Sequence, residues 1–162
     1  MAAVDYYLKI KGIDGESKDE KLKDHIELES WSWGETQQGT GGYGGGSGAG
    51  KVAMQDFHFV MKINKASPEL AKVCASGDHI GDATLICRKA GGKQEKFLEI
   101  KFTDVLVASF QTGGSGGADI LPMDQISLNF AKIEYEYFIQ DNKGITKSGG
   151  KFGHDVKTHK TT

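Results

Sequence analysis

The feature that most constrains this chain is an alternation of apolar and polar side chains over several long segments. The pattern runs through residues 53–63, 83–89 and 97–110. A period of two places successive side chains on opposite faces of an extended strand, whereas an amphipathic helix repeats every 3.6 residues. The three segments therefore predict long strands, each with one face directed at a core.

The remaining segments complete a mainly β fold. Further strands are predicted over 4–10, 26–33, 126–139 and 151–156. One helix is expected, because Ser67 can cap it, Pro68 suits its first position and Gly77 can end it. Hairpin turns are expected at Gly91-Gly92 and Asn142-Lys143-Gly144. We therefore expect a single domain over 1–162, an antiparallel β-barrel of two curled sheets with one flanking α-helix.

Two of these strands change phase partway along. In 26–33, the two apolar residues before position 29 and the two tryptophans after it lie on opposite faces. In 126–139 the apolar phase flips between Phe130 and Ile133. One extra residue in a β-bulge would bring each set back to one side. Alternatively both faces are covered, one by the core and one by another subunit.

Two segments are rich in glycine. Eight glycines lie between Gly39 and Gly50, and four more lie between Gly113 and Gly117. A loop as long as 39–50 in a compact domain is usually functional or disordered. We expect it to extend from the domain, and we expect the lysine-rich end, 157–162, to be a flexible tail.

The composition excludes several classes of protein. The formal charge is -2, which gives no reason to expect a nucleic-acid partner. No window approaches the 18 apolar residues of a membrane-spanning helix, so we expect no membrane insertion. The first residues lack the basic patch and apolar core of a signal peptide. We expect a cytoplasmic protein that could leave the cell only without a cleavable signal. Cys74 and Cys87 are interpreted as buried reduced thiols.

Several motifs resemble catalytic sites and fail in context. Residues 45–51 imitate a phosphate-binding loop, but Val52 stands where a serine or threonine should hold magnesium, and a strand follows instead of a helix. Ser115 lies within Gly113–Gly117 in the spacing of a nucleophile elbow, again without a following helix. The five histidines have no metal-ligand spacing. We predict no enzyme activity, no cofactor and no metal site.

A set of short blocks remains, and their order and spacing are specific. The blocks are Gly15-Glu16-Ser17, Trp31-Ser32-Trp33-Gly34, Gly48-Ala49-Gly50-Lys51, Ser67-Pro68, Ala75-Ser76-Gly77, Arg88-Lys89-Ala90-Gly91, Gly113-Gly114-Ser115-Gly116-Gly117 and Ile126-Ser127-Leu128-Asn129-Phe130-Ala131. Together they resemble the haemolysin-coregulated protein family, Hcp, across essentially the whole chain.

The resemblance implies a tube protein of the type VI secretion system. Members of that family form hexameric rings with a central channel, and the rings stack into a tube similar to that of contractile phage tails. A sheath drives the tube and its tip spike protein out of the cell, with effector proteins carried inside the rings. The resemblance thus implies a protein made in the cytoplasm and then secreted.

Two sites follow as hypotheses. Ser32, with Ser30 two residues before it, is expected to line the channel and bind effectors, because the adjacent tryptophans would face the core. The glycine-rich loop is expected to contact a neighbouring ring, through Gly41, Gly42, Tyr43, Gly44, Gly45, Gly46 and Ser47. The alternatives are a secreted binding module that forms no tube, such as an effector chaperone or an adhesin, and a hydrolase that uses Ser115.

Overall fold

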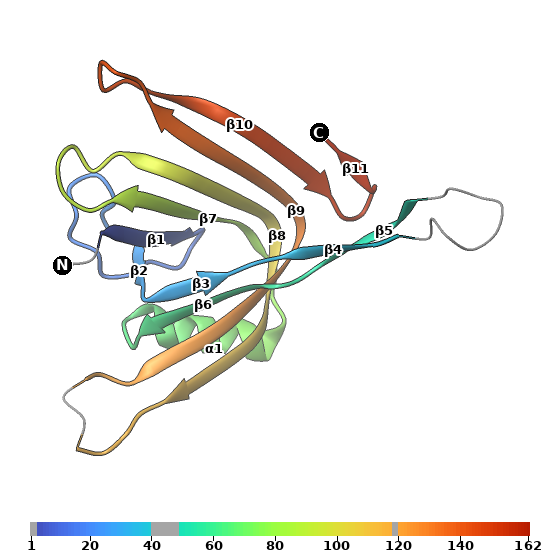
Figure 1. Cartoon of the computed structure of the whole chain (residues 1–162). Helices are drawn as coiled ribbons and strands as arrows, with labels where there is room; N and C mark the ends of the chain where they lie inside the picture. The colour runs from blue at the N-terminus through green and yellow to red at the C-terminus, as the bar shows by residue number, and fades with distance from the viewer. Residues whose placement is uncertain (1–2, 40–48, 118–119) are drawn as a thin grey trace.

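The computed structural model describes residues 3–39, 49–117 and 120–162, and Figure 1 shows a mainly β protein. Along the chain, the strands are β1 (Val4–Ile10), β2 (Ile26–Leu28), β3 (Ser30–Ser32), β4 (Glu35–Gly39), β5 (Ala49–Met54), β6 (Phe57–Lys62), β7 (Ile80–Lys89), β8 (Lys96–Gly113), β9 (Met123–Gln140), β10 (Thr146–Asp155) and β11 (Lys160–Thr161). The helix of the described residues is α1 (Ala66–Ser76). This architecture confirms the predicted fold class.

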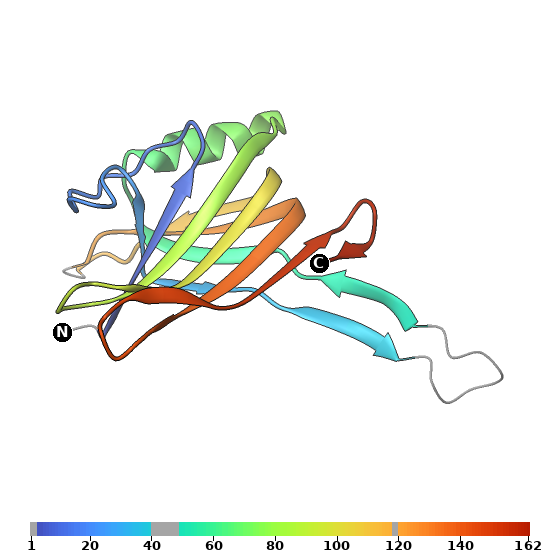
Figure 2. The ribbon, with the colours of Figure 1, turned by 90° about the horizontal axis from the view of Figure 1, so that it is seen from above.

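Nine of the strands form one antiparallel, curled sheet. Its main order is β11-β10-β9-β8-β7-β1-β2, and β6 joins the other half of β9 and also pairs with β3. The long strand β9 therefore bonds to β6 at its beginning and to β10 further along. Because β9 changes neighbours, the sheet wraps around on itself, and α1 packs along the outside (Figures 1 and 2). The sheet is curled as expected but does not close completely.

The core lies inside this curl. Phe57 and Phe102 are fully buried, with ring centroids 4.7 Å apart, and Phe130 lies 4.9 Å beyond Phe102. Such offset aromatic contacts add stability beyond that of the buried area. They join β6, β8 and β9, so the core holds together the two parts of the sheet that β9 connects.

The strand predicted over 26–33 is two strands separated by Glu29. Strand β2 pairs with β1, whereas β3 pairs with β6. Glu29 is the extra residue that brings both tryptophans to the core side, where Trp31 stacks on Phe57. The prediction that one extra residue brings the four apolar side chains to the same face is therefore correct. The extra residue marks a change of partner strand and not a bulge within one strand.

The phase flip near Phe130 has a different cause. Opposite it, β8 contains Asp104 with a φ of 55°, a left-handed conformation that aspartate adopts more readily than most residues. Both strands change phase there without a register shift, and the bulge in this pair lies instead between Val107 and Ser109. Consequently Val105 and Val107 are buried, and Leu106, expected in the core phase, is only half-buried.

The strand predicted over 53–63 is also divided. Residues up to Met54 belong to β5, which pairs with β4, and the chain then enters the main sheet as β6. Buried Phe57, Phe59 and Met61 confirm the alternation within β6. The β4–β5 hairpin projects from the body (Figures 1 and 2). The predicted loop 39–50 is therefore partly strand, since Gly39 ends β4 and Ala49 begins β5.

The helix begins earlier than predicted. Its first residue is Ala66, and Asn64 rather than Ser67 accepts a hydrogen bond from an amide of the first turn, at 2.8 Å from the Ala66 nitrogen. Ser67 is buried and donates its hydroxyl to the carboxylate of Asp124, at 2.5 Å. This bond ties the helix to β9. Gly77 ends the helix in a left-handed conformation, φ 72°, as predicted.

The last residues, 157–162, which are expected to be a flexible tail, include a short strand in the structure. The predicted strand 151–156 is the end of the longer β10, and β11 folds back onto it. Lys157 also forms an ion pair with Asp104 of β8, at 2.9 Å. The lysine content of the last residues does not predict either the strand pairing or the ion pair, because both depend on residues elsewhere in the chain.

Candidate functional site

The outward face of β3, β6, β9 and β8 carries the predicted serines. Ser30 and Ser32 are both exposed, on either side of Trp31, whose ring packs edge-on against Tyr6 with centroids 6.1 Å apart. Because side chains alternate along a strand, the inward Trp31 forces both serines outward. The structure thus places both serines on the side of the strand away from the tryptophans, as the sequence predicted.

The serines belong to a larger polar surface. Across the sheet, Ser32 lies opposite His58, His58 opposite Ser127, and Ser127 opposite Ser109. The next row runs from Ser30 through Val60 to Gln125 and Gln111. We call this surface the polar face, and it consists of Ser30, Ser32, His58, Ser109, Gln111, Gln125 and Ser127. Its members beyond β3 could not be identified from the sequence, since only strand register reveals them.

The polar face offers hydrogen bonds rather than fixed charge. Its one ionisable side chain is His58, and Ser127 Oγ lies 2.6 Å from His58 Nδ1. In the described part of the chain no carboxylate bonds to this histidine, so the pair lacks the third group that orients a catalytic dyad. Hydroxyl, amide and imidazole groups on a sheet suit the binding of a polypeptide surface better than nucleophilic chemistry.

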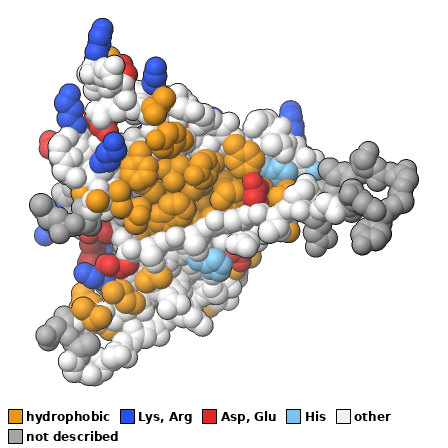
Figure 3. Space-filling view, viewed as in Figure 1, with side chains coloured by type: hydrophobic (Ala, Val, Ile, Leu, Met, Phe, Trp, Pro, Cys, Tyr) orange, Lys and Arg blue, Asp and Glu red, His pale blue; other side chains and the backbone are white. Residues whose placement is uncertain are grey.

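The apolar inner face of the sheet continues beyond the core. Leu8, Leu85 and Ile100 are fully buried in one cross-strand row, and the same row continues to half-buried Tyr135 and Phe152 on β9 and β10. Figure 3 shows this apolar surface between β10 and β3–β4. We call it the apolar rim, and it consists of Trp33, Tyr135, Tyr137, Ile139 and Phe152.

The apolar rim is unusual for the surface of an isolated domain. The rings of Trp33 and Tyr135 lie 6.4 Å apart, and Tyr137 and Ile139 are 48% and 42% exposed. The Trp33 indole nitrogen is buried without a hydrogen-bond partner among the described residues. Contiguous exposed apolar surface of this kind generally marks an interaction site.

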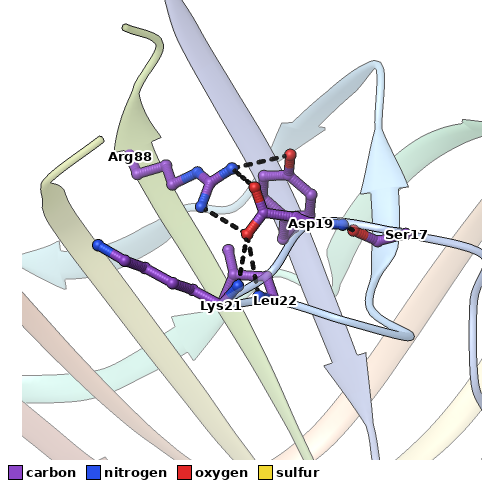
Figure 4. Close-up of polar contacts among 6 residues, drawn as sticks. Ser17, Asp19, Lys21, Leu22 and Arg88 are labelled. Carbon is purple, nitrogen blue, oxygen red and sulfur yellow. Dashed lines mark hydrogen bonds and ion pairs between the residues drawn. The ribbon is translucent and has the colours of Figure 1, made fainter. Parts of the chain in front are cut away.

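A buried ion pair holds the polar loop after β1. The guanidinium of Arg88 on β7 forms a two-pronged contact with the carboxylate of Asp19 and donates to the Tyr7 hydroxyl at 3.2 Å (Figure 4). Asp19 also accepts from the amides of Lys21 and Leu22. The Arg88 side chain is 4% exposed. We call Arg88, Asp19 and Tyr7 the loop clamp.

The loop clamp has clear electrostatic consequences. Hydrogen bonds from Arg88 hold the pKa of the Asp19 carboxyl well below its usual value, and the same contact raises the pKa of Arg88. Burial raises the pKa of the Tyr7 hydroxyl. Asp19 and Arg88 are 69 positions apart, so no spacing rule could have paired them from the sequence.

A groove lies at one end of the molecule, beside the clamped loop. It has a volume of about 220 Å³ and is lined by Glu16, Ser17, Glu27, Glu29, Lys62, Ile63, Asn64 and Leu121. We call it the end groove. Ser17 is buried and its hydroxyl accepts from the Asp19 amide at 3.2 Å, so the loop clamp and this wall of the groove are one unit.

The other sequence-based sites can now be placed. The predicted stacking residues Gly41–Ser47 lie outside the described residues, which include only the base of their loop. Ser115 follows the end of β8, and β9 begins at Met123 without an intervening helix over the described residues 120–122. Lys51 lies on β5, whereas a phosphate-binding loop would open a helix.

Within 3–39, 49–117 and 120–162, no group of three or more histidine, cysteine or acidic side chains is placed to hold a metal ion. Cys87 is buried, which raises the pKa of its thiol to about 12, and Cys74 is half-buried. The described helix is too short and too polar to cross a membrane.

Comparison with known proteins gives a consistent result. Residues 7–137 match the family described as "Type VI secretion system effector, Hcp". The chain is 44% identical to the protein Hcp1 of Pseudomonas aeruginosa over 158 residues, 96% of each chain. Its fold is similar to the crystal structure of Hcp1 from Salmonella typhimurium, with a TM-score of 0.80 and 36% identity over 99% of this chain and 100% of that chain. A further solved structure, titled a type six secretion system protein, has a TM-score of 0.90 and 31% identity over the same shares.

Proposed function

The chain belongs to the Hcp family of type VI secretion system proteins, and on that premise we propose that it is the ring-forming subunit of the secreted inner tube. In this proposal six copies form a ring with a central channel, and rings stack into a tube. The tube is ejected with its tip spike protein by the surrounding sheath. Effector proteins bound in the channel travel with it.

The observation that carries this proposal is the apolar rim. The core surface of the sheet runs onto β9 and β10, where the described residues of the chain leave it partly exposed. A second copy of the same chain would bury Tyr135, Tyr137 and Phe152 without any other partner being required. A heterologous contact, in which different surfaces meet, generates a ring when the rotation between successive copies closes.

The polar face then acquires a function. A ring that buries the apolar rim between subunits leaves the outward face of β3, β6, β9 and β8 free to line the channel. Ser30 and Ser32 lie at one side of this face, and His58 with Ser127 continue it. Such a lining would hold effectors through many hydrogen bonds and release them readily, since each exposed bond contributes little.

Ring formation can be tested with the purified chain. We expect annular particles with an axial hole by electron microscopy and a mass of several subunits by sedimentation. Tyr137→Lys should prevent ring formation, because a charge in the apolar rim would be buried unpaired. Ile145→Lys, at an exposed apolar position (59% against 48% for Tyr137) in the turn before β10, is the matched control and should leave the rings intact.

A well-folded monomer at high concentration would contradict the ring proposal. It would favour the alternative, a secreted binding module that acts as an effector chaperone or adhesin through the polar face alone. The channel assignment has its own test. Ser32→Trp should abolish co-purification of effectors with intact rings, whereas Ser76→Trp at the end of α1 should not. Normal effector retention in Ser32→Trp rings would make the channel assignment wrong.

A further inference from the structure

The β4–β5 hairpin has little support from its own molecule. We call its described residues, 35–39 and 49–54, the arm. Within the described chain, β4 and β5 form a separate two-stranded sheet and pair with no strand of the nine-stranded sheet. An isolated two-stranded hairpin is at best marginally stable in water. Met54 at the base of the arm packs against the core, whereas the projecting part would gain stability from a contact outside the molecule.

The end groove lies at the opposite end of the molecule from the arm. Both views show the arm projecting on one side, and β2, the end of β6 and the start of β9 on the other (Figures 1 and 2). The groove is lined by Glu27 of β2, Lys62 of β6 and residues that directly flank these strands and β9, together with Glu16 and Ser17 of the loop after β1. A contact between opposite ends of identical molecules does not close on itself in the pair and repeats from one layer to the next.

The groove and the arm are complementary in charge and polarity. The groove has three glutamates and one lysine, a formal charge of -2 from -3 and +1. Its apolar residues Ile63 and Leu121 are 42% and 58% exposed. The arm has an exposed lysine, Lys51, on the part of β5 that lies away from the base of the hairpin. Half-buried Val52 is next to it. The arm's acidic residue, Glu35, lies at the base opposite Met54.

The groove is preformed. The loop clamp fixes the segment that bears Glu16 and Ser17, and Gly15 lets the chain pass close to the next strand, since a Cβ at Gly15 would come within 2.5 Å of the His25 carbonyl oxygen. A binding surface that is already ordered loses little entropy when it is occupied.

From these four observations we infer that the end groove receives the arm of a second copy of this chain in the adjacent ring, with Lys51 among the groove carboxylates. The inference rests on the proposed function, because it gives the ring-stacking contact a receptor as well as a donor. Each contact is weak on the scale of exposed ion pairs. Several such contacts between two rings act together, so a modest change in each has a large effect on stacking.

Charge reversal tests the contact. Glu27→Lys in the groove and Lys51→Glu in the arm should each form normal rings that need at least about tenfold higher concentration to stack at low salt. The double variant, with both charges exchanged, should stack as readily as the unaltered chain. Matched controls are Glu20→Lys, on the clamped loop but outside the groove lining, and Lys143→Glu, in the turn before β10. Sedimentation and side-view electron microscopy measure the stacking.

The outcomes separate this inference from the proposed function. A chain that never forms rings contradicts the proposed function. Rings of the unaltered chain that never stack, or single variants that stack as well as the controls, overturn the inference and leave ring formation standing. Equal stacking in all variants would assign the groove to a different partner. Thermal unfolding of each variant identifies any that fails to fold, and recovery in the double variant excludes general damage as the cause.

Discussion

Two polar excursions leave this sheet, and the structure treats them in opposite ways. The loop between β1 and β2 and the arm are both rich in polar residues and glycine, and both look like surface loops in the sequence. The loop buries Ile13 in the core and is held by the loop clamp. The described residues of the arm have their own ladder, and Met54 at the base packs against the core. The difference shows that anchoring depends on distant partners rather than on local composition.

The comparison predicts, first, that the loop is part of the cooperative fold. Replacing Arg88 by methionine puts an apolar side chain at this nearly buried position. The Asp19 carboxylate then has no cation to pair with. Removing one partner of a buried ion pair generally costs about 3–5 kcal/mol, and we expect a loss near the lower value because Asp19 keeps its two amide donors. Urea unfolding measures the change. A loss below about 1 kcal/mol would mean that the loop is no better anchored than the arm.

The second prediction concerns the backbone of the same loop. Gly15→Ala places a methyl group against the His25 carbonyl and the Ile26 Cα, at 2.5 and 2.6 Å, so the loop or β2 must shift. Such overpacking costs about 1–3 kcal/mol. The matched control is Gly39→Ala, at the end of β4, where the added methyl has no atom of the described residues within 4 Å. Equal unfolding free energies for the two variants would contradict the contrast between the regions.

The third prediction uses pH. The pKa of Asp19 is lower in the folded state than its ordinary value of 3.8, so the clamp stabilises the fold fully above that value and less as pH falls below it. Asp19→Asn cannot titrate at this position. The stability gap between the unaltered chain and this variant should therefore be constant above about pH 5 and narrow between pH 4 and pH 2.5. A gap that stays constant down to pH 2.5 would show that the clamp contains no ionised carboxylate.

Sequence reasoning located the regular parts of the fold and missed the contacts between them. Period-two alternation identified β6, β7 and β8, because the burial of one face of a strand produces an apolar-polar pattern within the strand's own residues. It joined β5 to β6, since Ala53 happens to continue the alternation into a strand with a different partner. The bend at Asp104 was also missed, because it depends on backbone conformation rather than on polarity.

The same limit applies to the candidate sites. Ser30 and Ser32 could be oriented from the neighbouring tryptophans, which is a local argument. His58 and Ser127 could not be joined to them, because they meet only through the register of three strands. The groove lining comes from four separate segments, so its carboxylates appeared in the sequence as unrelated surface charges.

The last prediction has the smallest expected effect and tests the arm directly. Gln37→Pro removes an amide from β4, opposite Val52. In a central strand such a change is severe, and Thr84→Pro in β7, which pairs on both sides, should cost about 3 kcal/mol or more. If the arm is outside the cooperative core of the monomer, Gln37→Pro should change the global unfolding free energy by less than about 0.5 kcal/mol. Urea unfolding of the dilute, unstacked protein makes the measurement, and hydrogen exchange should show loss of protection confined to the arm. A destabilisation comparable to that of Thr84→Pro would make the arm an integral part of the domain, and it would then need no partner to hold its shape.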